Sequence, residues 1–244
     1  MQDDETSSRL GHAVPGWTPP PWPERVVTEG RFCRIEPLSA SAQAVELHRA
    51  NSADPSIWTY LPYGPFETPG AYQRWMREME GCADPMFFAV RPLASGRAAG
   101  VLSYLRIAPD AGSIELGHIN FSAELQRSVA ATEAMMLMIQ GAFEAGYRRF
   151  EWKCDALNRA SRRAAERLGL SYEGVFRQAT VVKGRNRDTA WFAAIDSEWP
   201  ALKAAYAAWL APSNFDADGQ QIMALSELTR DIRVSADPAL TQLT

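Results

Sequence analysis

The chain has 244 residues, 46% of them hydrophobic and 22% charged, which is the composition of a folded protein with one domain of ordinary size or two small ones. The net charge of -4 and the lack of a basic stripe predict no nucleic-acid partner. Three widely spaced cysteines without a CxxC pair exclude a disulfide framework or zinc ribbon and fit a reducing cytoplasm. The polar, acidic start and the absence of a long apolar run predict neither export nor a membrane partner.

The first 30 residues are predicted to form an arm outside the domain. Five prolines between residues 11 and 25 disfavour both helix and central strand. Trp17 and Trp22 lie within this stretch, and we expect them to press onto the domain surface, since that buries apolar area.

Residues 31–198 are predicted to form the main domain. Its first half is expected to contain a strand over 31–37, a helix over 41–50, an aromatic loop over 58–66, a helix over 68–80, and strands over 86–90, 98–105 and 114–121. Its second half is expected to contain a helix over 128–145, a strand over 149–154, a helix over 159–168, and strands over 172–176 and 189–195. This order predicts a mixed α/β (α+β) fold, a mostly antiparallel sheet with one parallel β-α-β crossover.

Residues 199–244 are predicted to form a C-terminal helix, beginning near Glu198 and ending at Leu210, followed by a tail. Tryptophans in the helix indicate that it docks on the domain. Beyond Pro212 the pattern of apolar residues is weak and predicts no regular element.

Several reaction classes lack their motifs. The sequence contains no GxGxxG, P-loop, GxSxG or HExxH, and it has three histidines, His12, His48 and His118. A hydrolytic triad or a histidine-rich metal centre therefore has little to build on, and we expect neither a metal nor a dinucleotide.

The junction from Glu115 to Ala134 is the first candidate site, because a strand leads there through a short loop into the strongest predicted helix. The first turn of a helix has unpaired N–H groups, so residues 126–131 could cradle a pyrophosphate, with charge added by Arg127. A serine-capped helix whose alanines only pack against the sheet explains the same pattern.

This junction, together with the segment E-W-K-C-D-A-L-N-R-A-S-R-R-A-A-E-R-L-G-L-S-Y-E-G from Glu151 to Gly174, resembles the GNAT superfamily of N-acetyltransferases, most closely its RimJ/RimL-like members. The resemblance covers roughly residues 31–198 and implies the GNAT fold, with acetyl-CoA as cosubstrate. In that family a Q/R-x-x-G-x-G/A loop holds the CoA pyrophosphate, and Val129 stands where the family usually has glycine. The cofactor-binding residues it implies are Asn120, Phe121, Gln126, Arg127, Ser128, Val129, Ala130, Ala131 and Asn158.

The same resemblance assigns catalytic roles. Asn158 and Ser161 match the family's N-x-x-S element, in which the asparagine binds the pantetheine arm and the hydroxyl protonates the departing thiolate, although Asn158 is equally a good N-cap. Backbone amides near 119–121 would stabilise the oxyanion. Glu115 is the first candidate for the general base and His118 the second. An ideal strand would put these two on opposite faces, so both line one pocket only if a bulge intervenes.

The acceptor side is predicted from aromatic residues. Trp58, Tyr60, Tyr63 and Phe66 could wall an acceptor pocket, whereas Trp75 is expected to serve in core packing. The function expected is transfer of an acetyl group to a primary amine, either a protein N-terminus or a small amine. A non-catalytic acyl-CoA-binding sensor or assembly module is the alternative, and a homodimer is expected only by analogy with the family.

Overall fold

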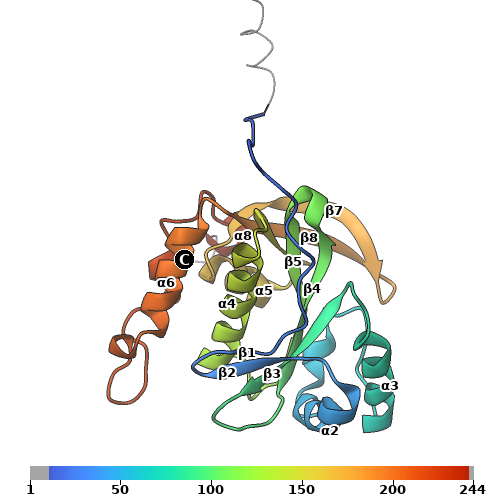
Figure 1. Ribbon diagram of the computed structural model, residues 1–244. Helices are drawn as coiled ribbons and strands as arrows, with labels where there is room; N and C mark the ends of the chain where they lie inside the picture. Colours follow the sequence, from blue (N-terminus) through green and yellow to red (C-terminus); the bar gives the residue numbers. More distant parts are fainter. Residues whose placement is uncertain (1–10, 242–244) are drawn as a thin grey trace, which may run out of the picture.

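The computed structural model describes residues 11–241, which form one eight-stranded sheet with helices on both faces (Figure 1). The strands are β1 (Thr28–Glu29), β2 (Cys33–Pro37), β3 (Met86–Pro92), β4 (Gly100–Ala108), β5 (Ser113–Phe121), β6 (Arg149–Asp155), β7 (Ser171–Val182) and β8 (Arg185–Ile195). Their order across the sheet is β1-β2-β3-β4-β5-β6-β8-β7. Neighbouring strands are antiparallel except β5 and β6, so the predicted mostly antiparallel sheet with one parallel crossover is confirmed.

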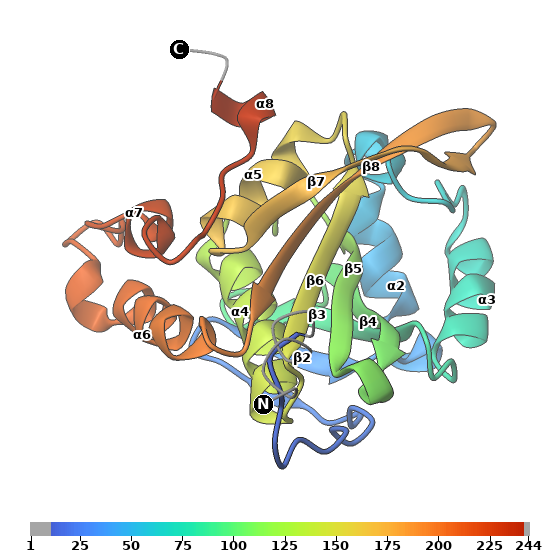
Figure 2. The same cartoon turned by 90° about the horizontal axis from the view of Figure 1, so that it is seen from above.

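Helices α4, α5 and α6 lie on one face of the sheet, and α2 and α3 lie on the other (Figure 2). The helices are α2 (Ala40–Asn51), α3 (Pro69–Met79), α4 (Val129–Glu144), α5 (Arg159–Arg167), α6 (Trp199–Leu210), α7 (Leu225–Thr229) and α8 (Pro238–Thr241). Within residues 11–241, no helix is long and apolar enough to cross a membrane.

Capping residues mark where the helices begin. The side chain of Thr68 accepts a hydrogen bond from the backbone N–H of Ala71, and Pro69 follows at the first helical position of α3. Ser128 caps α4 in the same way through the N–H of Ala131. Both starts were predicted from the sequence, and both are confirmed.

Each face of the sheet packs against the helices on that side, and the contact forms a separate apolar cluster. The larger cluster joins α4 to the inward residues of the central strands, and Leu202, Tyr206 and Trp209 of α6 belong to it. The smaller cluster lies under α2 and α3 and contains Trp58 and Phe87. The two clusters hold the sheet from both sides, which fixes the positions of the strand ends that form the site.

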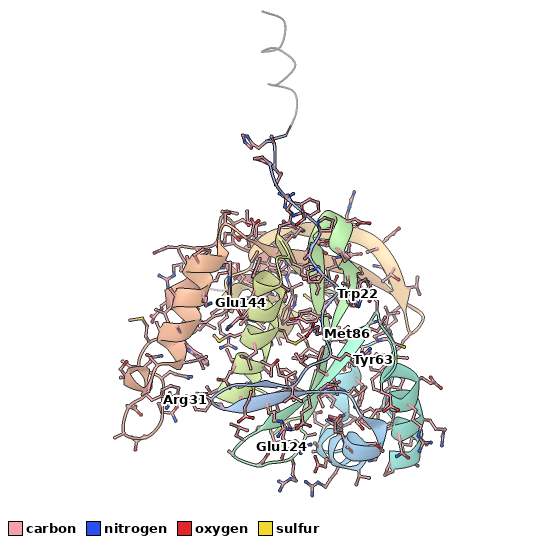
Figure 3. The ribbon with its side chains drawn as sticks, viewed as in Figure 1. Trp22, Arg31, Tyr63, Met86, Glu124 and Glu144 are labelled. Atoms are coloured by element: carbon pink, nitrogen blue, oxygen red, sulfur yellow. The ribbon has the colours of Figure 1, made fainter. Side chains whose placement is uncertain are left out.

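Residues 11–27 of the proline-rich arm run along the domain without regular secondary structure, and the first ten residues of the predicted arm lie outside the described part of the chain. The hydroxyl of Tyr147 donates a hydrogen bond to the carbonyl oxygen of Pro21, which ties the arm to the body of the protein. Trp22 remains 43% exposed and flanks a hollow of about 410 Å³ beside α4 (Figure 3). The expectation that this tryptophan presses onto the surface is therefore met only in part.

Two sequence-based expectations are wrong. The hairpin of β7 and β8 is longer than the predicted strands, because its outer part, 177–188, is polar and leaves the sheet, so no burial pattern marks it. The C-terminal segment, residues 212–241, is not a weakly patterned tail. It contains α7 and α8, and polar contacts with Arg162 and with the carbonyl oxygen of Arg167 hold it to the domain, which hydrophobic periodicity does not detect.

Candidate active site

The site begins where β5 and β6 separate. Their parallel pairing ends at Leu116 opposite Trp152, whereas β5 continues to Phe121 and β6 to Asp155. Beyond this point lies a cavity of about 250 Å³, which we call the β5–β6 cavity. Its walls come from the aromatic loop, the end of β4, the separated parts of β5 and β6, the start of α5 and Arg187 of β8.

A β-bulge in β5 brings the two predicted base candidates into this cavity. One residue of β4, Leu102, lies opposite both His118 and Ile119, and His118 has a left-handed φ of 50°. The extra residue reverses the alternation, so the side chains of Glu115 and His118 both line the β5–β6 cavity. The condition that the sequence left open, an intervening bulge, is therefore fulfilled.

Glu115 lies at the floor of the cavity with a side chain that is 2% exposed. Its carboxylate accepts hydrogen bonds from Nε of Arg106 at 2.7 Å and from Nη2 of Arg106 at 2.9 Å, and Nζ of Lys153 lies at 2.9 Å. The carboxylate therefore forms ion pairs with two cations at once.

His118 packs among aromatic rings rather than against a carboxylate. Its ring stacks on Tyr63 at a centroid distance of 5.5 Å and tilts against Phe87 at 5.2 Å. Burial, together with the positive charges of Arg106 and Arg187, lowers the pKa of His118 to about 4. The imidazole is therefore neutral at physiological pH.

The start of α5 places two predicted residues beside the cavity. The side-chain oxygen of Asn158 accepts the N–H of Ser161 at 3.1 Å, so Asn158 is the N-cap that its sequence position indicates. The hydroxyl oxygen of Ser161 accepts a hydrogen bond from the indole N–H of Trp152 at 2.9 Å. Burial raises the pKa of the neighbouring Cys154 to about 11, so this residue is an inert thiol rather than a nucleophile.

The turn between β5 and α4 has the features of an anion cradle. Arg127 adopts a left-handed φ of 59°, and the Gln126 side chain donates a hydrogen bond to the carbonyl oxygen of Phe121 at 2.8 Å. Within the described chain, the backbone N–H groups of Arg127, Val129 and Ala130 make no hydrogen bond, whereas the N–H of Ala131 is taken by the cap. Three free donors at a helix start suit a phosphate group.

The remaining predicted cofactor residues are buried. Asn120 is 1% exposed, and both polar atoms of its side chain lack a hydrogen-bond partner within residues 11–241. Phe121 is also buried and belongs to the larger apolar cluster. An orphaned buried amide on β5, just past the separation of β5 from β6, is where a bound ligand would complete the hydrogen bonding.

The aromatic loop divides its four predicted residues between cavity and core. Tyr60 lines the β5–β6 cavity, and Tyr63 stacks on His118. Trp58 and Phe66 instead pack edge to face at 5.4 Å in the cluster under α2 and α3, where Trp75 also packs. Figure 3 shows Tyr63 on the side of the sheet that carries α3.

Three basic residues of the site were not predicted from the sequence: Arg106, Lys153 and Arg187. Lys153 stands on a strand that alternates regularly, whereas the strands of Arg106 and Arg187 do not alternate, so no local pattern singles out these cations. Arg106 reaches Glu115 because a second bulge, with a φ of 46° at Arg106, is held by the carboxylate of Asp84. Among the described residues, no cluster of histidine, cysteine and carboxylate groups could hold a metal.

A family model described as an acetyltransferase (GNAT) domain matches residues 34–171. A solved GCN5-related N-acetyltransferase from Brucella melitensis is 49% identical, with a TM-score of 0.87, and the match covers 89% of this chain and 100% of that one. A probable GNAT-family acetyltransferase from Chromobacterium violaceum is 41% identical, with a TM-score of 0.74, covering 79% of this chain and 97% of that one.

A more distant solved structure shares the fold. The microcin C7 self-immunity acetyltransferase MccE, in complex with acetyl-CoA and AMP, is 19% identical, with a TM-score of 0.61, over 68% of this chain and 93% of that one. No curated protein sequence matches the chain significantly.

Proposed function

This chain belongs to the GNAT family of acetyltransferases, and we propose that it transfers the acetyl group of acetyl-CoA to a primary amine by direct attack. The observation that supports this most is that three parts of the chain meet at one cavity. They are the end of β5 that extends beyond its pairing with β6, the start of α5 with Ser161, and the carboxylate of Glu115. We further propose a RimJ/RimL-like subtype and a homodimer, which the resemblance implies, and a cytoplasmic location, which the widely spaced cysteines favour.

The free N–H groups at the start of α4 would hold the pyrophosphate of the coenzyme. Backbone donors of Arg127, Val129 and Ala130 have no other partner within the described chain, and the formal charge of Arg127 adds to the partial charge of the helix terminus. Val129 in place of glycine leaves these donors free, since a side chain does not remove a backbone N–H. The acetyl thioester supplies the electrophilic carbonyl carbon.

The part of β5 that extends beyond its pairing with β6 would stabilise the charge that develops on the thioester oxygen. Backbone amides near residues 119–121 lie beyond Leu116, the last residue of β5 that pairs with β6, while β5 stays paired with β4 as far as Phe121. Fixed donors in a largely buried site stabilise a developing oxyanion without having to reorganise. The nitrogen–carbon bond forms as the carbon–sulfur bond breaks, and the thiolate then needs a proton.

Ser161 would supply that proton. Its oxygen already accepts a hydrogen bond from Trp152, which orients the hydroxyl and leaves the O–H as the remaining donor. The amine loses a proton in the same reaction, and we assign Glu115 to accept it through a water molecule. His118, which is neutral at physiological pH, is the second candidate for that role.

Calorimetric titration with acetyl-CoA, beside NADH and ATP as controls, tests the first half of the proposal. Selective micromolar binding is expected, because a pyrophosphate site built from backbone donors does not depend on one side chain. Absence of binding by acetyl-CoA and by CoA would refute the proposed function.

The second half is tested by acetyl transfer over a panel of primary amines. Binding of acetyl-CoA without turnover of any amine would favour the alternative of a non-catalytic acyl-CoA-binding module. The ion pairs that Glu115 makes with Arg106 and Lys153 are compatible with this alternative, in which the carboxylate has a structural role.

A further inference from the structure

Five charged side chains line the β5–β6 cavity, and they differ in how their charge is satisfied. The cations are Arg106, Lys153 and Arg187, and the anions are Glu115 and Asp155. Arg106 and Lys153 are both committed to Glu115, at 2.7 and 2.9 Å. The carboxylate of Asp155 accepts a hydrogen bond from the backbone N–H of Leu157 at 2.9 Å. Arg187 is then the cation of the cavity whose partner has not been named.

Arg187 is unpaired. Across residues 11–241 it forms no ion pair, and its Nε is buried without a hydrogen-bond partner. Leaving a buried donor of a charged group unsatisfied costs free energy, so such a group usually has a role that supplies the partner. The charge of Arg187 acts on the cavity, since it contributes to the lowered pKa of His118.

Two hydrogen bonds hold the aromatic loop, which forms one wall of the cavity. The Tyr60 hydroxyl donates to the carbonyl oxygen of Leu157 at 3.3 Å, joining the loop to the start of α5. On the other side, Nζ of Lys183 donates to the carbonyl oxygen of Trp58 at 2.9 Å, so the tip of the β7–β8 hairpin also meets the loop (Figure 2). The volume of the cavity, about 250 Å³, suits a compact molecule.

We propose that the acceptor is a small amine that also carries a carboxylate or phosphate group, and that Arg187 binds this anionic group. The inference rests on the proposed acetyl transfer and names its substrate class. Guanidinium groups bind both anions through paired hydrogen bonds, which also fix the orientation of the ligand. The amine end would then lie toward Glu115 and Asp155, the two carboxylates of the cavity.

Matched amines test the proposal. The probes are O-phosphoethanolamine with ethanolamine, and β-alanine with its amide, each measured for binding to the CoA-saturated protein and for kcat/KM with acetyl-CoA. We expect the anionic member of at least one pair to be favoured by roughly 10- to 100-fold, which is the range for a charge-assisted hydrogen bond. The phosphate pair and the carboxylate pair show which anion the site prefers.

Arg187→Gln should abolish the preference by raising KM for the anionic amine. The value of kcat should change little, and KM for the neutral amine should not change. Arg185→Gln is the matched control, because Arg185 is exposed on the same hairpin and does not line the cavity. Equal binding of both members of each pair, or a preference that survives in Arg187→Gln, would overturn the inference. Acetyl-CoA binding in the same preparations shows that such a failure concerns the acceptor alone, not the proposed function.

Discussion

Charge at the residue scale is balanced around Glu115 by a chain of alternating partners. Glu115 shares Lys153 with Glu151, Glu151 shares Arg149 with Glu173, and Arg106 completes the series at the cavity. Removing one member therefore leaves its neighbour with an unmatched charge, and the cost is largest where the side chains are buried. Glu115 and Lys153 are the two most buried members, with side chains 2% and 6% exposed.

Glu115→Gln should lower kcat on the preferred amine by about 100-fold or more, because a positioned general base contributes this much. Rates over a range of pH are the measurement, since loss of the base also makes the rate rise with hydroxide concentration. Glu151→Gln is the control: it breaks a pair with the same Lys153 but does not line the cavity. Equal rates for Glu115→Gln and the wild type would remove Glu115 from the mechanism and leave His118 or solvent as the base.

Ser161→Ala should reduce kcat by about tenfold or more and leave the affinity for acetyl-CoA nearly unchanged, because the hydroxyl acts when the thiolate leaves. Trp152→Phe breaks the same Trp152–Ser161 hydrogen bond but keeps the hydroxyl, so it separates proton donation from support of the helix start. An acetyl thioester whose thiol has a low pKa supplies a further check, because its thiolate leaves without a proton. With this acetyl donor, the rate of Ser161→Ala should approach the wild-type rate. If the defect persists there, Ser161 has a different role.

The neutral His118 makes folding sensitive to acid. Its pKa is about 4 in the folded protein and about 6.5 in an unfolded chain, so the unfolded state binds more protons between these values. The free energy of unfolding should therefore fall as pH decreases from about 6.5 to 4, by up to about 3 kcal/mol from this residue. Urea unfolding at several pH values measures it. In His118→Asn, which keeps a residue suited to left-handed φ, this part of the slope should vanish.

Elements with one apolar face follow from the sequence, whereas the irregularities that build the site do not. Periodicity and caps predicted α3 and α4 to within a residue or two, because burial against the sheet and satisfaction of the first N–H groups both leave a local pattern. The bulges at Arg106 and His118 depend on Asp84 and on the ring contacts of Tyr63 and Phe87, all distant in sequence. Thus Glu115 and Ser161, which line the cavity, were among the residues predicted from the sequence, whereas the cationic lining was not.

At the scale of elements, the β7–β8 hairpin is expected to limit access to the cavity. Lys183→Ala removes the one hydrogen bond described between the hairpin tip and Trp58, so KM for the amine should rise severalfold while calorimetric affinity for acetyl-CoA stays the same. Lys203→Ala is a suitable control, since Lys203 pairs with Glu144 on the opposite side of the sheet. A change in acetyl-CoA affinity instead would show that the hairpin supports the coenzyme side.

At the scale of the whole molecule, the C-terminal segment packs onto α5, the helix that contains Ser161, so we expect residues 11–241 to unfold as one unit. Arg162 directly follows Ser161, and its guanidinium makes a two-pronged ion pair with Asp237, which is fully buried. Arg159, at the start of α5, donates to the carbonyl oxygen of Ala239. Composition and periodicity could not show this, since a single buried polar pair carries no repeating signal.

Breaking the Arg162–Asp237 pair should therefore weaken both stability and catalysis. Asp237→Asn leaves a buried guanidinium without its counter-charge, for which we expect a loss of about 3 to 5 kcal/mol in the free energy of unfolding. The double variant Arg162→Met with Asp237→Leu removes both charges and should be more stable than Asp237→Asn, because no buried charge stays unpaired. Urea denaturation measures the free energy of unfolding of both variants.

If the C-terminal segment also positions α5, kcat should fall in both variants at a temperature where both are folded. The affinity for acetyl-CoA should be less affected. Wild-type kcat in the folded double variant would restrict the segment to a stabilising role.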